Sequence, residues 1–237
     1  MSFTDEIIKL FEKYNIELSL KQAKMFELYK NELVEWNKIH NLTAIVDDEG
    51  VMVKHFLDSV LPYKEIENGA SVIDIGTGAG FPSIPLKIMN DSLKFTLVDS
   101  VGKKLDFVRN VISKLGLNDM SVIHARCEDL ANLGDYREKY DYSVSRAVSS
   151  LTTLMEYSVP FIKVGGKMLC YKGSNYQEEI DTCKNTFNIL LSEIIDIKSY
   201  AVDEMDATRY LLVIKKNGST PNKYPRGMNK PRLKPLN

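Results

Sequence analysis

Residues 71–82 read SVIDIGTGAGFP, and this stretch decides the fold. An apolar run with the acidic Asp74 near its end, then a glycine-rich turn, then Pro82, predicts a strand, a ligand-binding loop and the start of a helix. Because glycine has no Cβ, the backbone of this loop can turn sharply and approach a ligand closely. Pro82 suits the first position of the helix, since its missing N–H would have no partner there.

The spacing of these glycines distinguishes between cofactors. Three residues after Gly78 stands Phe81, so the dinucleotide fingerprint G-x-G-x-x-G fails, and no G-K-[ST] of a triphosphate site follows. What remains is D-x-G-x-G-x-G with Asp99 at the end of the next apolar run, a pattern typical of S-adenosylmethionine (SAM) methyltransferases. We expect Asp99 to accept hydrogen bonds from the ribose hydroxyls. We expect Asp74 to face the cationic amino-acid end of SAM, directly or through water. The alternative is that the loop is only a tight turn.

Composition is that of an ordinary globular protein. The 237 residues, 44% hydrophobic and 27% charged, suffice for one large domain with a small appendage. Cys127, Cys170 and Cys183 stand far apart without a C-x-x-C, so we expect neither a disulfide framework nor a metal site. Asp5 and Glu6 argue against a signal peptide, and no apolar run reaches the ~18 residues of a membrane span. These features predict a cytoplasmic protein without a membrane partner.

Charge is unevenly distributed along the chain. The net charge is −1, but residues 207–237 carry eight basic side chains and no acidic one, which leaves 23 basic against 32 acidic, or −9, over residues 1–206. Such asymmetry favours contact between the C-terminal part and a polyanion, with a solvated basic tail as the alternative.

The hydrophobic pattern predicts an α/β fold of the Rossmann-like type, with helices on both faces of one sheet. Strands are expected at Ser71–Ile75, Phe95–Asp99, Ser121–Ala125, Tyr140–Ser145, Lys167–Tyr171, Glu193–Ala201 and Arg209–Lys215, and helices at 82–90, 103–115, 150–160 and 175–190. No helix fits between the last two strands, so the last strand should be antiparallel. Seven strands with one reversed is the usual methyltransferase architecture.

Three regions follow from this pattern. Helical spacing over 4–14, 19–39 and 49–60, with Ser19 and Gln22 as a capping box, predicts that residues 1–66 form a helical N-terminal extension that caps the site. Residues 67–216 form the methyltransferase domain. Residues 217–237 form a basic tail, and its prolines are expected to exclude regular secondary structure.

Ligands of such a sheet bind at the carboxyl ends of its strands, where the strand order reverses. This rule selects the residues that follow the first four strands, namely 76–81, 99–100, 126–129 and 145–147. Glu128 either reads the amino edge of the adenine or is an acid stabilised by the dipole at a helix N-terminus. Arg146 would be costly as a buried unpaired charge, so we expect it to pair with a carboxylate of the cofactor or of Asp74, or with RNA. Lys103 and Lys104 are expected on a solvated face.

The residues after the fourth strand bear on the methyl acceptor. An exocyclic amine usually needs a [DN]-P-P-[YF] clamp, but Ser145-Arg146-Ala147 stands in its place. Methylation of pyrimidine C5 needs a cysteine nucleophile, and no Pro-Cys loop occurs. A ring nitrogen such as guanine N7 already offers its lone pair, so alignment and electrostatics suffice. The sequence fits this third case.

Several blocks now carry a family resemblance: residues 36–44 (WNKIHNLTA), 55–59 (HFLDS), 74–85, 144–147 (VSRA), 165–166 and 232–236. They resemble the signature blocks of the bacterial RsmG family, formerly called glucose-inhibited division protein B, over nearly the whole chain. The resemblance implies a SAM-dependent enzyme that methylates N7 of one guanine in the decoding region of 16S rRNA. It implies a 30S subunit or its precursor as partner. We expect a monomer. The cofactor residues implied are Gly76, Phe81, Cys127, Glu128 and Arg146, to which the physical argument adds Asp74, Gly78 and Asp99.

Polar residues of the first two blocks are candidates for positioning the acceptor: Asn37, Asn41, Thr43, His55, Asp58 and Ser59. Our hypothesis is that Asn41 and His55, with Arg146, position the guanine or shape its pocket. The alternatives are a capped turn at Asn41 and a surface i, i+3 pair of His55 with Asp58. Two other functions also stay open, namely a SAM-dependent methyltransferase of a small molecule or protein, and a non-catalytic RNA-binding protein with this fold.

Overall fold

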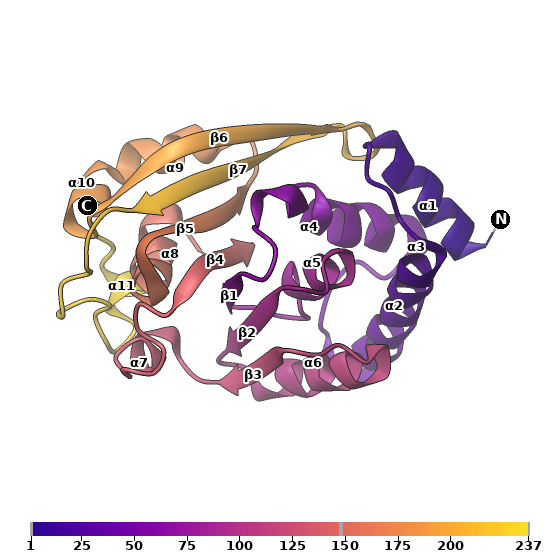
Figure 1. Ribbon diagram of the computed structural model, residues 1–237, viewed down its shortest axis with the longest axis horizontal. Helices are drawn as coiled ribbons and strands as arrows, with labels where there is room; N and C mark the ends of the chain where they lie inside the picture. The colour runs from indigo at the N-terminus through magenta and orange to yellow at the C-terminus, as the bar shows by residue number, and fades with distance from the viewer. Residues whose placement is uncertain (1, 147–148, 237) are drawn as a thin grey trace.

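A single mixed sheet organises the chain in the computed structural model, which describes residues 2–146 and 149–236 (Figure 1). Within these residues seven strands occur in the order β3-β2-β1-β4-β5-β7-β6. Their bounds are β1 Ser71–Ile75, β2 Lys94–Asp99, β3 Met120–His124, β4 Tyr140–Arg146, β5 Ile162–Lys172, β6 Ser192–Val202 and β7 Ala207–Lys216. The predicted fold class is confirmed.

Strand directions place the site. β1 pairs in parallel with β2 on one side and β4 on the other, so the chain order reverses between β1 and β4. Side by side at this point lie Asp74 of β1 and Val144 of β4. β7 runs antiparallel to both β5 and β6, as the missing helix between the last strands predicted. The carboxyl ends of β1, β2 and β4 therefore meet where such sheets bind ligands.

Helices cover both faces of the sheet (Figure 1). One face packs against α5 Ser83–Met89 and α6 Gly102–Leu115, over which α1 Phe3–Lys13 and α2 Leu20–His40 form an outer layer. The other face packs against α7 Cys127–Leu130, α8 Leu151–Ser158, the 3₁₀ turn η3 Val159–Phe161, α9 Tyr176–Thr182 and α10 Lys184–Ile189. β7 shows the cause: Leu211 and Val213 join the first core, and Leu212 and Ile214 join the second, because successive side chains of a strand point to opposite faces.

The N-terminal extension is helical, as expected. Ser19 and Gln22 form the predicted capping box of α2. The predicted helix 49–60 is a continuous run of α3 Asp48–Gly50, the π-helix η1 Val51–Leu57 and α4 Asp58–Val60, which packs against α5. The short 3₁₀ turn η2 Tyr63–Glu65 then leads toward β1. Tyr29 of α2 donates a hydrogen bond from its hydroxyl to the carbonyl of Ala79 at 2.5 Å, which ties the extension to the glycine loop.

Three sequence expectations need correction. Pro82 does not begin a helix but precedes one, because α5 starts at Ser83. The expected helix 175–190 is divided at Cys183 into α9 and α10. The C-terminal segment is not devoid of regular structure, since α11 Lys230–Leu233 forms in it. Pro231 lies in the first turn of α11, where a missing N–H leaves no hydrogen bond unmade.

The β6–β7 hairpin closes the fold along one edge. Its turn, the 3₁₀ segment η4 Asp203–Met205, reaches α1, where Glu204 pairs with Lys13 at 2.7 Å (Figure 1). No helix within residues 2–146 and 149–236 has the length and apolar character needed to cross a bilayer.

Candidate active site

The glycine loop after β1 turns through left-handed backbone conformations. φ is 73° at Gly76, 57° at Gly78 and 93° at Gly80. The amide of Gly76 donates to the carbonyl of Val98 at 2.8 Å, which fastens the loop to β2. A Cβ added at Gly80 would lie 2.5 Å from Cδ1 of Ile84, so the loop also packs too closely there for a side chain. The glycines thus bring the backbone against the end of β2.

Asp99 closes the other side of this loop. Its Oδ2 accepts the amide of Gly78 and its Oδ1 accepts the amide of Val101, both at 2.9 Å. Each carboxylate oxygen has a second lone pair, so Asp99 can still accept from a diol. The carboxylate faces a cavity of about 380 Å³ at the carboxyl edge of the sheet. Asp99 is therefore placed as the ribose-binding hypothesis requires.

Asp74 lies deeper than expected. Its side chain is fully buried and does not line that cavity. Oδ2 accepts the hydroxyl of Ser83 at 2.7 Å, whereas Oδ1 has no hydrogen-bond partner among the described residues. Burial raises the pKa of Asp74 to about 7. A buried carboxylate oxygen without a partner suits a cationic group brought close to it, so the residue fits the amino-acid end of SAM.

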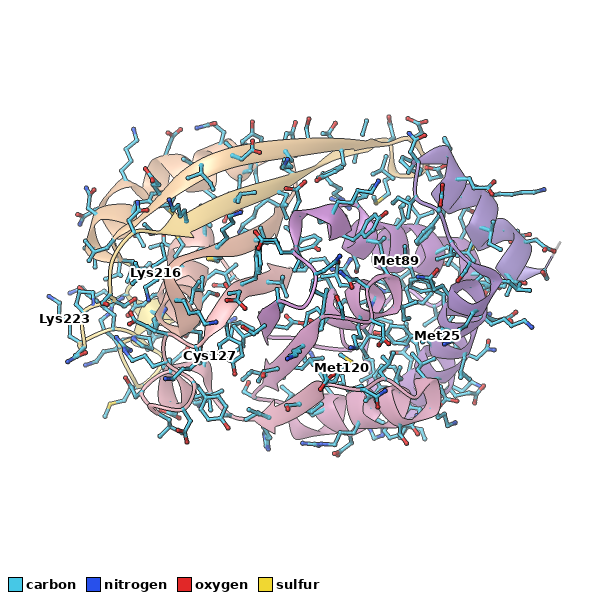
Figure 2. All side chains as sticks on the ribbon, in the orientation of Figure 1. Met25, Met89, Met120, Cys127, Lys216 and Lys223 are labelled. Carbon is cyan, nitrogen blue, oxygen red and sulfur yellow. The ribbon has the colours of Figure 1, made fainter. Side chains whose placement is uncertain are left out.

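The residues after β3 form the floor of the cavity. Cys127 (Figure 2) and Glu128 both line it. Glu128 is buried and lies in the first turn of α7. The position of Glu128, beside the cavity and at the start of α7, is compatible with both alternatives given for it. Burial raises the pKa of Cys127 to about 12, so this thiol stays protonated and does not act as a nucleophile.

Besides the strand-end residues Ile75 and Ala125, four residues line the cavity that the sequence argument did not place there: Lys104, Tyr157, Asn229 and Arg232. Lys104 was expected on a solvated face. Tyr157 comes from α8, and the other two come from the C-terminal segment, so only the tertiary fold unites them. No local pattern identifies them.

Arg146 ends β4 and finds a partner within the chain. Its Nη1 lies 2.8 Å from Oδ2 of Asp58, and the same atom donates to the carbonyls of Lys54 and His55. The partner within the chain is Asp58, which the sequence argument did not name. Asp74 was the wrong candidate, because the helical run of η1 and α4 brings Asp58 to the end of β4. The guanidinium also lies over the ring of Phe81, 5.1 Å from its centroid. Ala147, which follows Arg146, lies outside the described residues.

His55 also contacts Phe81: the two rings stack with their centroids 4.6 Å apart. Its Nε2 lies 2.9 Å from Oγ1 of Thr43, and its Nδ1 has no hydrogen-bond partner among the described residues. Burial, and then the charge of Arg146, lower the pKa of His55 to about 4. The imidazole is therefore neutral at pH 7, and it does not pair with Asp58.

His55, Asp58 and Arg146 line a second cavity, of about 430 Å³. Tyr171 of β5 and Arg209 of β7 also contribute to its wall, and Nε of Arg209 lies 3.1 Å from Oδ1 of Asp58. Two basic side chains thus share one carboxylate at this cavity.

Of the remaining candidate residues, some hold His55 and its neighbours in place, and others lie away from both cavities. Asn37 accepts the amide of Thr43 at 2.9 Å and so holds the residue that contacts His55. Ser59 is buried and donates to the carbonyl of His55. Asn41 is exposed, caps the end of α2 at φ 47° and does not line either cavity. Phe81 is buried behind the loop rather than at the first cavity.

A sheet of this order with β7 reversed, a glycine loop after β1 and an acidic residue at the end of β2 define the class of Rossmann-like SAM-dependent methyltransferases. Within that class, residues 22–205 match the family model GidB, described as rRNA small subunit methyltransferase G. The chain belongs to this family.

Relatives agree over nearly the full length. The ribosomal RNA small subunit methyltransferase G of Alkaliphilus metalliredigens is 44% identical over 217 residues, 91% of each chain. That of Acetivibrio thermocellus is 46% identical over 224 residues, 94% of this chain and 92% of the other. Among solved structures, M. jannaschii TYW2 in complex with AdoMet aligns at a TM-score of 0.50 and 17% identity, covering 66% of this chain and 74% of that one. This last likeness concerns the fold alone.

Proposed function

We propose that the protein transfers a methyl group from SAM to N7 of a single guanine in 16S rRNA, presented by the small ribosomal subunit or its precursor. The observation that carries the proposal is the pair of cavities at the carboxyl edge of the sheet. Ile75 at the end of β1 and Gly76 after it line the first, and Arg146 at the end of the neighbouring β4 lines the second. A donor and an acceptor can thus approach each other across the ends of two adjacent strands.

The first cavity is assigned to the donor. When bound, SAM supplies a methyl group made electrophilic by its sulfonium. Asp99 accepts from the ribose hydroxyls, Glu128 accepts from the adenine amino group, and the backbone of Gly76 and Gly78 allows close approach. Buried Asp74 would offer its unpartnered Oδ1 to the cationic amino-acid end.

The second cavity is assigned to the guanine. N7 carries an in-plane lone pair at neutral pH, so the chain need only orient the base and stabilise charge. Neutral His55 lines this cavity and would help to orient the base, and Arg146, paired with Asp58, would offer hydrogen-bond donors from the cavity wall. Phe81 supports both, because His55 and Arg146 contact the same ring. In this proposal residues 1–66 cap the acceptor side, and no residue acts as a general base.

Ribosomal RNA as substrate is supported by the names of the relatives and by charge. The relatives are called ribosomal RNA small subunit methyltransferases. Exposed lysines of the C-terminal segment, Lys223, Lys230 and Lys234, offer contacts for phosphates, and Lys223 projects from the outer margin of the molecule in Figure 2. Such a substrate implies a cytoplasmic site of action.

The direct test uses 30S subunits from cells that lack this protein, incubated with it and with SAM labelled in the methyl group. Borohydride reduction and aniline then cleave the RNA at 7-methylguanine. We expect one new cleavage in 16S rRNA. Label in RNA without cleavage would contradict N7 as the methylated atom. Label found only in protein or small molecules would contradict RNA as the substrate.

Matched variants test the positioning residues. We expect His55→Ala to lower the rate of transfer at saturating SAM while SAM affinity stays near that of the wild type. Asn41→Ala addresses the hypothesis for Asn41, although its exposed position favours a helix-capping role. Unchanged rates for both variants would remove these two residues from the acceptor site.

A further inference from the structure

The basic C-terminal segment does not simply project into solvent as a tail. Of the basic residues that give residues 207–237 their charge, at least three form ion pairs within the described part of the fold. These are Arg209 with Asp58 at 3.1 Å, Lys216 with Glu138 at 2.7 Å and Arg226 with Glu156 at 2.7 Å. The segment is therefore held on the body of the protein by charges of opposite sign elsewhere in the chain.

Arg226 is the principal anchor. Its Nε and Nη2 donate to both carboxylate oxygens of Glu156, a fully buried residue of α8, at 2.8 and 2.7 Å. Nη2 also donates to the carbonyl of Lys234 at 2.8 Å. One guanidinium thus joins both ends of residues 226–234, which we call the C-terminal loop. Its middle is fixed as well, because Oγ1 of Thr153 donates to the carbonyl of Pro231 at 3.0 Å.

This loop lies against the donor cavity. The amide of Asn229 donates to Oε1 of Glu128 at 3.2 Å, and the hydroxyl of Tyr157 donates to Oδ1 of Asn229 at 3.3 Å. Asn229 and Arg232 line the same cavity as Gly78 and Asp99. The loop therefore forms the wall of the cavity beside Glu128 and Tyr157.

We infer that the C-terminal loop is part of the donor site, with Arg232 as a binding residue for the adenine end of SAM and Asn229 as a positioning residue for Glu128. The inference rests on the proposed use of SAM. The chemistry fits an adenine ring. A guanidinium is a planar group that stacks on aromatic faces and donates to ring nitrogens, while a carboxylate held by Asn229 accepts from the exocyclic amine.

The inference separates the basic residues of the segment into two groups. Lys230 and Lys234 flank Arg232 and are exposed, but they do not line the cavity. If the whole segment served only to attract RNA, the three side chains would have similar effects, all of them on RNA binding. If the loop belongs to the donor site, Arg232 is the one of these three side chains that affects the binding of a nucleoside in the absence of RNA.

Calorimetry on the full-length protein without RNA provides the test, with S-adenosylhomocysteine and 5′-methylthioadenosine as ligands. We expect Arg232→Ala to weaken both ligands by a similar factor of about ten, the loss of one hydrogen bond to a charged group. Arg232→Lys should recover part of that loss. Lys230→Ala and Lys234→Ala are the matched controls and should bind within twofold of the wild type.

Asn229→Gly tolerates the left-handed φ of 57° and keeps the backbone amide that donates to Glu128. It removes the side chain that accepts from the Tyr157 hydroxyl and so holds that amide in place. It should weaken both ligands severalfold without changing the melting temperature of the free protein by more than a few degrees. A merely structural loop would lower that temperature and leave affinity unchanged.

Each outcome is decisive. Unchanged affinity of Arg232→Ala for both ligands overturns the inference while leaving SAM use intact. A loss confined to S-adenosylhomocysteine, which alone carries the amino-acid portion, contradicts the adenine assignment. A wild-type protein that binds neither ligand overturns the proposed function together with the inference.

Discussion

Asp74 makes the stability of the free protein depend on pH in an unusual direction. An unfolded carboxyl has its ordinary pKa of 3.8, and burial raises the pKa of Asp74 in the folded protein to about 7. The folded state therefore binds the proton more tightly than the unfolded state does. The contribution of Asp74 to stability is fully present below pH 3.8 and is lost as pH rises through 7. The loss from this group is about 2 kcal/mol at pH 5 and about 4 kcal/mol at pH 8.

Asp74→Asn removes the titration but keeps an acceptor for the hydroxyl of Ser83. Urea unfolding of both proteins without ligand, at pH 5, 6, 7 and 8, measures the difference in the free energy of unfolding. We expect the variant to gain on the wild type by roughly 2 to 3 kcal/mol between pH 5 and pH 8, and the difference to level off above pH 7.

Asp141→Asn is the control for this measurement. A lysine and a serine beside Asp141 hold its pKa down to about 2, so it is ionised throughout the same range. Its difference from the wild type should not change with pH. A difference for Asp74→Asn that is equally flat would refute the assignment of Asp74 as a buried, partly protonated carboxyl.

Further predictions concern stability at three other places. The pKa of His55 is about 4 in the folded protein against 6.5 in the unfolded chain, so its contribution to stability is lost as pH falls from 6.5 through 4. His55→Phe should reduce this loss in urea titrations between pH 7 and pH 5. An equal loss in both proteins would mean that another group causes it. Gly80→Ala should lower the free energy of unfolding by about 2 kcal/mol or more in thermal unfolding, because the added Cβ has no space. The control Gly116→Ala, at φ 63° in open space, should cost about 1 kcal/mol, and equal losses would argue against crowding at the glycine loop. Arg226→Ala leaves buried Glu156 without its ion-pair partner and should cost about 3 to 5 kcal/mol in urea unfolding, with faster proteolysis of the C-terminal segment; a loss below about 1 kcal/mol would contradict its role as anchor.

The sheet was predictable because its information is local. β1 has the predicted bounds Ser71–Ile75, since a short apolar run before a glycine turn allows little choice. The reversed β7 followed from a connection too short for a helix. Asp99 could be placed at the first cavity from the sequence because it ends the strand next to β1.

Side-chain partners across the fold could not be predicted in this way. Asp58 pairs with Arg146, which lies 88 positions later in the chain. The π-helical turn before Asp58 makes this contact possible, and no residue spacing in the sequence predicts that turn. The C-terminal loop is a similar case, because its anchor Glu156 looks like any polar residue of a helix until α8 is seen to be wholly buried. Charge counting along the chain therefore overstated how much of the C-terminal part is open to a polyanion.

The proposed function depends most on the binding of an adenosyl compound in the first cavity. A crystal structure of the protein with S-adenosylhomocysteine tests this directly. We expect the ribose hydroxyls on Asp99 and the adenine between Glu128 and Arg232. A nucleoside bound at another place, with Gly78 and Asp99 untouched, would contradict the account.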